Sequence, residues 1–457
     1  MAKTLTDDEQ EQPADQGQAH LLTHVLNYDD LLAPPLGALR LDGLSELLIG
    51  RAEGEQPIGF VRPGTFRLAD AWVSGRHASI ARAGAGSAMA ITDLGSRNGV
   101  LVDGERISGR RTLEDGARVE IGHALFIYRR LAAEVADALD APGPELAFGG
   151  GRTWCPELAF LLRRVERLAD SKQPVLLLAE TGSGKEILAQ HIHARSGRRG
   201  RFVAVDCGAI PDSLFESTMF GHVRGAFTGA EGRLGELRAA DQGSLFLDEV
   251  GNLSTANQAK LLRVLETSQL APLGAAESAA IDVRWIAATN EDLLAEPGRF
   301  RSDLFHRLAG FVAELPPLRE RREDLGVLCS QALKEVAVSR ASIAPPAARR
   351  LFSHAFPGNV RQLRSWVKTA ALLAGDGPIR LDHLPELGER PSVEAPAQPP
   401  PPAPSEKKTP TAAELSAALT TTKGNVVRAA KLLGTHPRQL YRWLDLLKLS
   451  LDDFRDR

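Results

Sequence analysis

Cysteine is scarce in this chain of 457 residues. The three cysteines, Cys155, Cys207 and Cys329, lie far apart and show no metal-site or disulfide spacing, which suits a reducing cytoplasm. No run of about eighteen apolar residues is present, so the sequence predicts no membrane span. The acidic, polar first residues do not resemble a secretion signal. The net charge of −3 excludes a chain-wide basic surface, so any nucleic-acid binding must be local.

A glycine-bearing loop between two regular elements occupies residues 174–190, PVLLLAETGSGKEILAQ. Four apolar residues, 175–178, predict a buried parallel strand, and apolar periodicity after Lys185 predicts a helix. Backbone N–H groups at such a helix N-terminus converge on phosphate, and Lys185 would reach the outer phosphates of a nucleoside triphosphate. A tight structural turn is the alternative. The candidate ATP-binding residues here are Ala179, Glu180, Thr181, Gly182, Ser183, Gly184, Lys185 and Glu186.

A second buried strand, GSLFLDEV, ends in two carboxylates, Asp248 and Glu249. At the C-terminal end of a strand in an open α/β sheet, these side chains meet the ligand crevice. Asp248 is the candidate ligand of hydrated Mg²⁺, and Glu249 would orient or deprotonate the attacking water. A lone Asp-Glu pair would more often be a solvated turn. Following a phosphate loop and an apolar strand, the pair favours catalysis.

The segment RGAFTGA at residues 224–230 completes a resemblance to the AAA+ ATPase domain of bacterial enhancer-binding proteins, the activators of sigma-54 RNA polymerase. The resemblance runs from about Leu146 to Leu387, and Glu186 is usual in that family, whereas Ala179 departs from it. It implies that the loop tip contacts sigma-54 and moves with the nucleotide state; a loop packed on its own domain is the alternative. The implied contact residues are Gly225, Ala226, Phe227, Thr228, Gly229 and Ala230.

The same resemblance implies arginine fingers in the segment RFRSDLFHRL. Phe300, Leu304 and Leu308 form an apolar stripe with helical spacing. On one continuous helix Arg301 and Arg307 would lie about 120° apart, so they need not share a target. Either arginine could reach the nucleotide of a neighbouring subunit, or both could simply be solvated. A finger acting between subunits requires a ring, which is hexameric in the family.

Two further nucleotide contacts are implied by the resemblance: Asn290 at the sensor position after a third strand, and Arg361 in the lid segment FPGNVRQL. A solvated lid arginine is the alternative for the second. Two residues depart from the family, Asp206 in place of Asn and Thr218 in place of Glu. An Asp facing Glu249 would put two carboxylates together, so we expect hydrolysis to depend more strongly on pH.

Short apolar runs separated by Gly, Pro and Asp predict an all-β sandwich over residues 25–130. Gly50-Arg51, the segment 74–78 and the segment 96–99 resemble the loops of a forkhead-associated (FHA) domain, which binds phosphothreonine. Guanidinium, hydroxyl and amide donors suit a phosphate. His77 would brace the loop, and a sandwich used only for self-association is the alternative. The candidate phosphothreonine contacts are Arg51, Ser74, Arg76 and Asn98.

A proline-rich spacer at residues 389–410 precedes a segment with helical apolar spacing and two Gly-containing breaks. GNVVRAAKLLG and RQLYRWL resemble the Fis-type helix-turn-helix that closes most enhancer-binding proteins. Exposed polar residues of the second helix are the candidate DNA contacts, Arg438, Gln439 and Arg442. A small helical oligomerisation module is the alternative.

The predicted fold class is multidomain: an FHA-like β-sandwich, an α/β AAA+ P-loop ATPase with a helical lid, and a small all-α helix-turn-helix domain. The expected function is ATP- and Mg²⁺-dependent remodelling of sigma-54 RNA polymerase holoenzyme from upstream enhancer DNA, regulated by a phosphothreonine protein such as a serine/threonine kinase. A sigma-54-independent regulator whose ATPase controls assembly, and a phosphopeptide scaffold with a vestigial ATPase, are the rivals. The predicted parts are a disordered tail (1–24), the sandwich (25–130), a linker (131–145), the ATPase core (146–315), the lid (316–388), a linker (389–410) and the helix-turn-helix (411–457).

Overall fold

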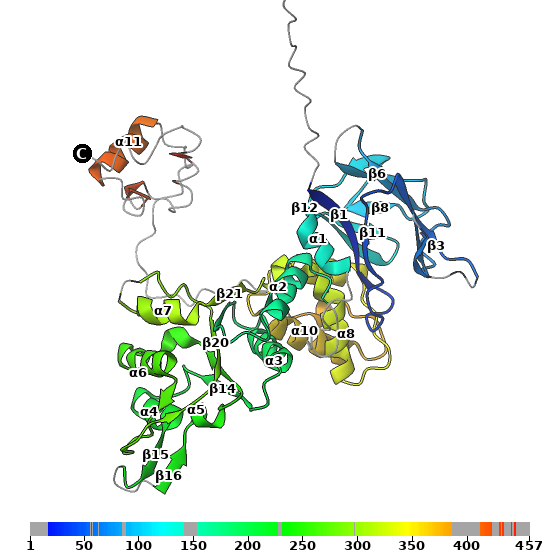
Figure 1. Ribbon diagram of the computed structural model, residues 1–457. Helices are drawn as coiled ribbons and strands as arrows, with labels where there is room; N and C mark the ends of the chain where they lie inside the picture. The colour runs from blue at the N-terminus through cyan, green and yellow to red at the C-terminus, as the bar shows by residue number, and fades with distance from the viewer. Residues whose placement is uncertain are drawn as a thin grey trace, which may run out of the picture. The chain divides into compact units, whose positions relative to one another are not determined.

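The computed structural model divides the chain into two compact units, residues 1–386 and 387–457 (Figure 1). No helix in the described part of the chain combines the length and apolar character that a membrane crossing requires. The structure describes residues 17–54, 56, 58–62, 64–84, 88–140, 153–226, 231–296, 298–385, 412–422, 429–430, 432–433, 440 and 443–444.

Two six-stranded sheets form the predicted β-sandwich, with a core of aliphatic and aromatic side chains that includes Leu22, Ile49, Phe66 and Phe126. The first sheet contains, in spatial order, β2 (Gly37–Arg40), β1 (Gln18–Asn27), β12 (Ala124–Ala132), β11 (Arg118–Ile121), β8 (Val100–Val102) and β9 (Glu105–Arg106). The second contains β10 (Arg110–Thr112), β7 (Met89–Asp93), β6 (Ala78–Arg82), β3 (Glu46–Arg51), β5 (Thr65–Leu68) and β4 (Gly59–Arg62).

The sandwich begins earlier than the sequence predicts, because β1 starts at Gln18 inside the segment assigned to a disordered tail. This strand pairs with both β2 and β12, and every residue from Ala19 to Leu26 is buried. His20, Thr23 and His24 interrupt the apolar run and hide its strand character in the sequence. The boundary at residue 25 is therefore wrong.

The segment predicted as a helical link contains the end of β12 followed by α1 (Ala133–Asp140). Ala136, Ala138 and Leu139 of this helix are buried against Leu21 and Ala159. The predicted helix is therefore present, but it is a packed element rather than a free connection.

A five-stranded parallel sheet forms the predicted α/β domain. Successive residues of its strands alternate between two apolar layers, so Val175 and Leu177 face one layer and Leu176 faces the other. The spatial order is β14 (Phe202–Asp206), β17 (Ser244–Asp248), β20 (Arg284–Thr289), β13 (Val175–Leu178) and β21 (Phe311–Glu314). Because all strands run the same way, the polar residues that end them meet at one edge.

Helices cover both faces of this sheet (Figure 1). On one face lie α2 (Pro156–Arg167) and α3 (Lys185–Arg195). The other elements of the domain are α4 (Asp212–Phe220), α5 (Glu236–Ala239), η1 (Val250–Asn252), α6 (Thr255–Thr267), α7 (Ser302–Leu308), and the short pairs β15 (Gly221–Arg224) with β16 (Glu231–Leu234) and β18 (Gln269–Leu270) with β19 (Ala279–Ala280).

A helical lid follows β21 and packs around a core that it shares with the sandwich. Val25, Tyr28 and Leu31 enter this core from the sandwich side. The elements of the lid are η2 (Leu318–Glu320), η3 (Arg322–Asp324), α8 (Leu325–Glu335), α9 (Pro345–Ser353), α10 (Asn359–Ala374) and η4 (Leu381–His383). In the second unit the structure describes α11 (Ala412–Thr421) and a small apolar cluster that includes Leu415, Leu419, Leu440 and Leu444.

Candidate nucleotide and phosphopeptide sites

The phosphate loop between β13 and α3 makes a turn that requires glycine at two positions. Gly182 and Gly184 adopt left-handed backbone conformations with φ of 77° and 106°. A Cβ at Gly182 would lie 2.4 Å from the carbonyl oxygen of Gly358 in the lid, so the loop and the lid touch through backbone atoms. The Oγ of Ser183 donates a hydrogen bond to the Glu180 carbonyl at 2.6 Å and closes the turn. The loop is therefore shaped before any ligand binds.

Lys185, the first residue of α3, is buried and contacts both carboxylates that follow β17. Its Nζ lies 2.9 Å from Oδ1 of Asp248 and donates a hydrogen bond to Oε1 of Glu249. Glu249 adopts a left-handed conformation with φ of 51°, which turns its side chain toward the lysine after the strand has ended. The predicted phosphate-binding and catalytic side chains thus meet at one place.

Asp206 ends β14 beside Asp248, and the two residues are partners in the parallel register. The Oδ1 of Asp206 accepts a hydrogen bond from the Gly208 amide at 2.9 Å. Burial and the neighbouring carboxylates of Asp206, Asp248 and Glu249 raise the pKa of Cys207 to about 12. Negative charge therefore gathers at this edge of the sheet, and Lys185 is the cation that contacts two of its members.

A cavity of about 710 Å³ opens in front of these residues, between the phosphate loop and lid helices α8 and α10. Its lining is Thr181, Gly182, Gly184, Lys185, Glu186, Ile187, Asp206, Asp248, Glu249, Leu328, Gln331, Val360, Arg361, Arg364, Ser365 and Lys368. Pockets of this size hold nucleotides and other cofactors. Backbone amides, a lysine and arginines suit a polyphosphate, and carboxylates beside them suit Mg²⁺. The donor set thus fits a magnesium nucleotide.

Lid side chains form hydrogen bonds and an ion pair with the phosphate loop. These contacts were not predicted from the sequence. Arg319 forms a bidentate ion pair with Glu180, with N–O distances of 2.7 and 2.9 Å, which keeps the pKa of that carboxyl below its usual value. Arg321 donates to the carbonyl oxygen of Ser183, and Asn359 donates to Glu180 and to the Thr181 carbonyl. The only signal in the sequence was the run of arginines in PLRERRED, which does not indicate a target.

The remaining predicted nucleotide contacts lie at the rim of the loop. Ala179 is buried and donates its amide to the Thr289 carbonyl at 3.0 Å, whereas Glu186 is exposed on α3. The Nδ2 of Asn290 lies 3.4 Å from Oγ1 of Thr181. Arg361 lines the cavity, and its amide donates to the Gly182 carbonyl at 3.4 Å.

Arg301 and Arg307 do not line the cavity formed by their own chain. Helix α7 begins at Ser302, so Arg301 lies before the helix, and the angle of about 120° that one continuous helix would give does not apply. Arg301 is the extended residue before the helix because its amide donates to Oε1 of Gln258 at 2.8 Å, and its guanidinium pairs with Asp303 at 2.6 Å. Phe300, Leu304 and Leu308 are all buried, as their apolar stripe predicts.

The predicted sigma-54 contact segment lies in the hairpin formed by β15 and β16, which projects beyond α4 and α5 (Figure 1). Gly225 and Ala226 follow β15, and Gly225 has a φ of 83°. Exposed apolar side chains on the hairpin, Val223 and Leu234, lack the cover that a purely structural hairpin would have. Phe227, Thr228, Gly229 and Ala230 lie outside the described residues.

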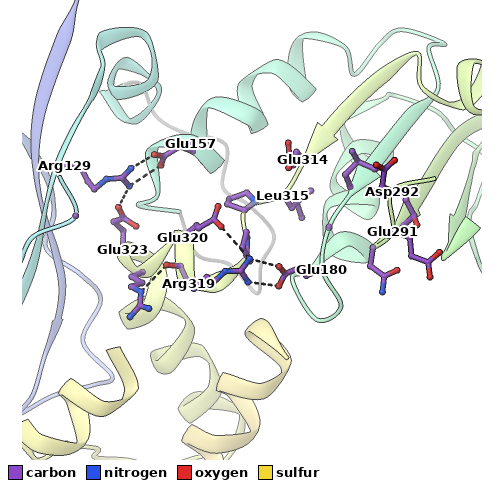
Figure 2. Close-up of a pocket in the computed structure, with 18 of the residues that line it drawn as sticks. Arg129, Glu157, Glu180, Glu291, Asp292, Glu314, Leu315, Arg319, Glu320 and Glu323 are labelled. Carbon is purple, nitrogen blue, oxygen red and sulfur yellow. Dashed lines mark hydrogen bonds and ion pairs between the residues drawn. The ribbon is translucent and has the colours of Figure 1, made fainter. Parts of the chain in front are cut away.

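A second cavity of about 970 Å³ begins at Glu180 and extends toward the sandwich (Figure 2). Carboxylates outnumber guanidinium groups in its lining, with Glu157, Glu291, Asp292 and Glu314 among them. This negative charge is unsuited to a triphosphate. The smaller cavity, where Lys185 lies, is therefore the candidate nucleotide site.

In the sandwich, the three loops singled out in the sequence meet at one end. The amide of Arg51 donates to the Ser74 carbonyl at 2.9 Å, and the Nδ2 of Asn98 donates to the Trp72 carbonyl at 2.7 Å. Buried His77 accepts from the Ser74 amide through Nδ1 and bonds the Gly99 carbonyl through Nε2, so it braces the loops. The guanidinium-bearing residues Arg51 and Arg76 are exposed.

Two basic residues at this end were not among the candidate phosphothreonine contacts predicted from the sequence. Arg67 on β5 donates to the Gly75 carbonyl at 2.8 Å, and the amide of Arg97 donates to Oγ of Ser74 at 3.3 Å. A Cβ at Gly50 would lie 2.0 Å from the Gly75 carbonyl oxygen, so the loops are closely packed. The result is a preorganised basic surface with hydroxyl and amide groups. The candidate DNA contacts Arg438, Gln439 and Arg442 lie outside the described residues.

Comparison with known families identifies four parts of the chain in a fixed order. An FHA domain matches residues 47–122, a Sigma-54 interaction domain matches 154–314, an AAA+ ATPase lid domain matches 319–399, and a bacterial regulatory protein of the Fis family matches 412–445. The fold and the site thus define an AAA+ module of the sigma-54 interaction class between an FHA domain and a helix-turn-helix. The four matches, in this order, correspond to the architecture of a sigma-54 enhancer-binding protein with an FHA domain and a helix-turn-helix.

Similar proteins include transcription regulators that match this chain over part of their length. The anaerobic nitric oxide reductase transcription regulator NorR of Citrobacter koseri is 47% identical over 227 residues, which cover 48% of this chain and 45% of the relative. NorR of Salmonella agona is 46% identical over the same length. The chain thus spans about half the length of these curated relatives. The crystal structure of NtrX from Brucella abortus in complex with ADP shows 31% identity, with a TM-score of 0.49, covering 69% of this chain and 72% of that one.

Proposed function

We propose that the chain hydrolyses ATP in the cavity between the phosphate loop and the lid, and that this hydrolysis activates sigma-54 RNA polymerase. The observation that carries the proposal is the convergence of Lys185, Asp248 and Glu249 on one cavity at the C-terminal edge of a parallel sheet. The match to the Sigma-54 interaction domain supports the choice of polymerase.

Each of these residues has a distinct role in the proposed reaction. Mg²⁺ would supply positive charge at the phosphates, and Asp248 would hold it. Lys185 would bind the outer phosphates, and Glu249 would orient the attacking water and accept its proton. Because Lys185 contacts both carboxylates in the present structure, nucleotide binding would draw its ammonium toward phosphate and free Glu249.

Two substitutions separate binding from hydrolysis. Lys185→Ala should abolish ATP binding, because it removes the cation that lies at the phosphate loop beside Asp248 and Glu249. Glu249→Gln should preserve binding and lower turnover by roughly 10²–10⁴-fold, the usual contribution of a general base. Phosphate release and titration with a fluorescent ATP analogue measure the two properties. Wild-type turnover in both variants would refute the proposed site.

Ring assembly is a further part of the proposal, and the position of two arginines supports it. Since Arg301 and Arg307 lie away from the cavity of their own chain, we propose that at least one of them reaches a neighbouring protomer's nucleotide in a hexamer. Turnover per subunit should then rise with protein concentration. Arg301→Ala or Arg307→Ala should lose turnover while ATP binding is retained, and loss in neither variant would argue against the ring.

The hairpin at β15 and β16 is the proposed contact with sigma-54, and the C-terminal part is the proposed contact with upstream DNA. Thr228→Ala should retain ATP turnover and lose open-complex formation with purified sigma-54 holoenzyme. If promoter opening requires neither ATP nor sigma-54, the rival regulator whose ATPase controls only assembly is favoured. A protein with these partners would act in the cytoplasm.

The preorganised basic end of the sandwich supports phosphothreonine recognition as the regulatory input. Full-length protein should bind a phosphothreonine peptide more tightly than its unphosphorylated form, and Arg51→Ala should remove the difference. Equal binding of both peptides by the wild type would reject this input. A point substitution is preferable to deletion of the sandwich, because deletion would expose the core shared with the lid.

A further inference from the structure

The sandwich and the lid are joined by backbone contacts as well as by apolar packing. The Leu31 amide donates to the Ala341 carbonyl at 2.8 Å, and the Ile343 amide donates to the Tyr28 carbonyl at 2.7 Å. Around these bonds, the shared core combines residues of β1 with residues of α8, α9 and α10. Contacts of this kind hold two elements in a defined orientation, because every buried backbone group must keep its partner.

Arg129 on β12 forms the charged part of the same junction (Figure 2). Its guanidinium lies 2.6 Å from Oε1 of Glu323 in η3 and 3.1 Å from Oδ1 of Asp115, and it also pairs with Glu157 in the first turn of α2. The side chain of Glu323 is only 2% exposed. One arginine of the sandwich therefore neutralises a buried carboxylate at the start of the lid.

The residues around Glu323 form a lid-entry segment, residues 318–324, that contacts the phosphate loop directly. Within this segment Arg319 pairs with Glu180, and Arg321 donates to the Ser183 carbonyl. At its end, Asp324 accepts hydrogen bonds from the Thr153 hydroxyl at 2.8 Å and from the Trp154 amide at 2.7 Å. These groups occupy consecutive 3₁₀ turns, so a displacement of Glu323 moves the groups that hold the loop.

We propose that Arg129, in the sandwich, is a positioning residue of the ATPase: by neutralising Glu323 it holds the lid-entry segment against the phosphate loop and sets the affinity for nucleotide. This inference rests on the proposed ATPase activity. Arg129 is absent from the lining of the nucleotide cavity, so it acts through the backbone of the loop. Loop contacts bind the ground state and the transition state alike, which changes KM and leaves kcat largely intact.

The environment of Glu323 explains why its carboxylate cannot stay ionised in place once Arg129 is removed. Burial raises the pKa of Glu323 to about 7 although Arg129 acts to lower it, and Glu157 contributes to the rise. Within the lid-entry segment, Arg322 faces the ring of Phe352 at 5.2 Å rather than pairing with Glu323 in a salt bridge. Without Arg129, the buried carboxylate must therefore take up a proton or leave its site.

The test compares Arg129→Met with Arg130→Met in the full chain. Arg130 is the next residue of β12 and is exposed. Arg130→Met therefore makes the same change of side chain and removes the same charge as Arg129→Met. We expect Arg129→Met to raise the KM for ATP and the dissociation constant of a fluorescent ATP analogue at least fivefold, with kcat within twofold of wild type. Arg130→Met should leave all three unchanged, and Arg129→Lys should recover part of the affinity.

A second substitution distinguishes positioning from general damage. Glu323→Gln in the Arg129→Met background removes the buried carboxylate, which the single variant can keep in place only by protonating it. At alkaline pH, where that protonation is unfavourable, the double variant should therefore bind nucleotide more tightly than Arg129→Met alone. Equal KM values for Arg129→Met and Arg130→Met, or a double variant no better than the single one, would overturn the proposal. A wild type that neither binds nor hydrolyses ATP would overturn the proposed function as well.

Discussion

Gly326, at the second position of α8, lies against the backbone of β1 and offers a direct test of the junction. A methyl group at this position would lie 1.8 Å from the carbonyl oxygen of Val25 and 3.1 Å from Cβ of Leu26. A close C–H···O contact needs about 3.3 Å, so Gly326→Ala must separate the lid from the sandwich by about 1.5 Å. A backbone carbonyl cannot rotate away as a side chain could.

The magnitude follows from three opposing effects. In a free helix, Gly→Ala stabilises by about 1 kcal/mol. Forcing a methyl group into a packed contact costs about 1–3 kcal/mol, and loss of the Leu31 and Ile343 amide bonds costs about 1 kcal/mol each. We therefore expect a net destabilisation of about 2–4 kcal/mol at the junction, opposite in sign to the helix propensity.

Hydrogen exchange of full-length protein measures this effect locally. The amides of Leu31 and Ile343 should lose protection in Gly326→Ala, because they bond across the junction. Gly377→Ala is the matched control, since its methyl group would lie 3.3 Å from the nearest atom, the Ala374 carbonyl oxygen. If Gly326→Ala is as stable as the wild type and these two amides keep their protection, the reasoning about the shared core is refuted.

Three further substitutions test other parts of the unit. Arg284 is 1% exposed and donates to the carbonyls of Leu168, Ala169 and Ser171 at the end of α2. Arg284→Met should therefore lower the free energy of unfolding, measured by denaturant titration, by about 3–5 kcal/mol. A loss below about 1 kcal/mol would contradict this account. Burial lowers the pKa of His24 to about 3, so its proton uptake favours the unfolded state as pH falls from 6.5 toward 3. The control is His24→Asn, which keeps an acceptor for the Leu36 amide but does not titrate in this range. Compared with this variant, the wild type should lose about 1.4 kcal/mol of folding stability between pH 7 and 5.5. If the two proteins show parallel curves of stability against pH, the buried neutral state of His24 is contradicted. Asp206→Asn should weaken the dependence of ATP turnover on pH, because it removes one of the carboxylates gathered beside Asp248; superimposable pH–rate profiles would reject the idea.

The local chemistry of this protein could be predicted from the sequence. The phosphate loop before Lys185 and the strand before Asp248 carry patterns that depend only on neighbouring residues. Parallel strands bring their C-terminal ends to one edge, so the meeting of Lys185 with Asp248 and Glu249 followed from the class of fold. The FHA and helix-turn-helix parts were likewise recognisable from short segments, and the family matches confirm them.

Other features depended on which surfaces meet in three dimensions. Strand β1 was missed because polar residues interrupt its apolar run although they are buried, as His24 is against Phe66 and Phe126 of the sandwich core. Arg129 and Glu323 are 194 residues apart, and nothing near either one in the sequence indicates the other. Arg319 and Arg321 are likewise more than 130 residues away in sequence from the phosphate-loop residues that they contact.

Sequence alone thus identified the class of each part and the residues expected to carry its chemistry, because phosphate and carboxylate sites require particular residues at short spacing. The tertiary structure decided how the parts are joined, namely that the sandwich shares a core with the lid and that one of its arginines neutralises a carboxylate of the lid. The physical reason is that burial and charge pairing are properties of contacts between distant segments. A residue's own neighbours in the chain do not encode them.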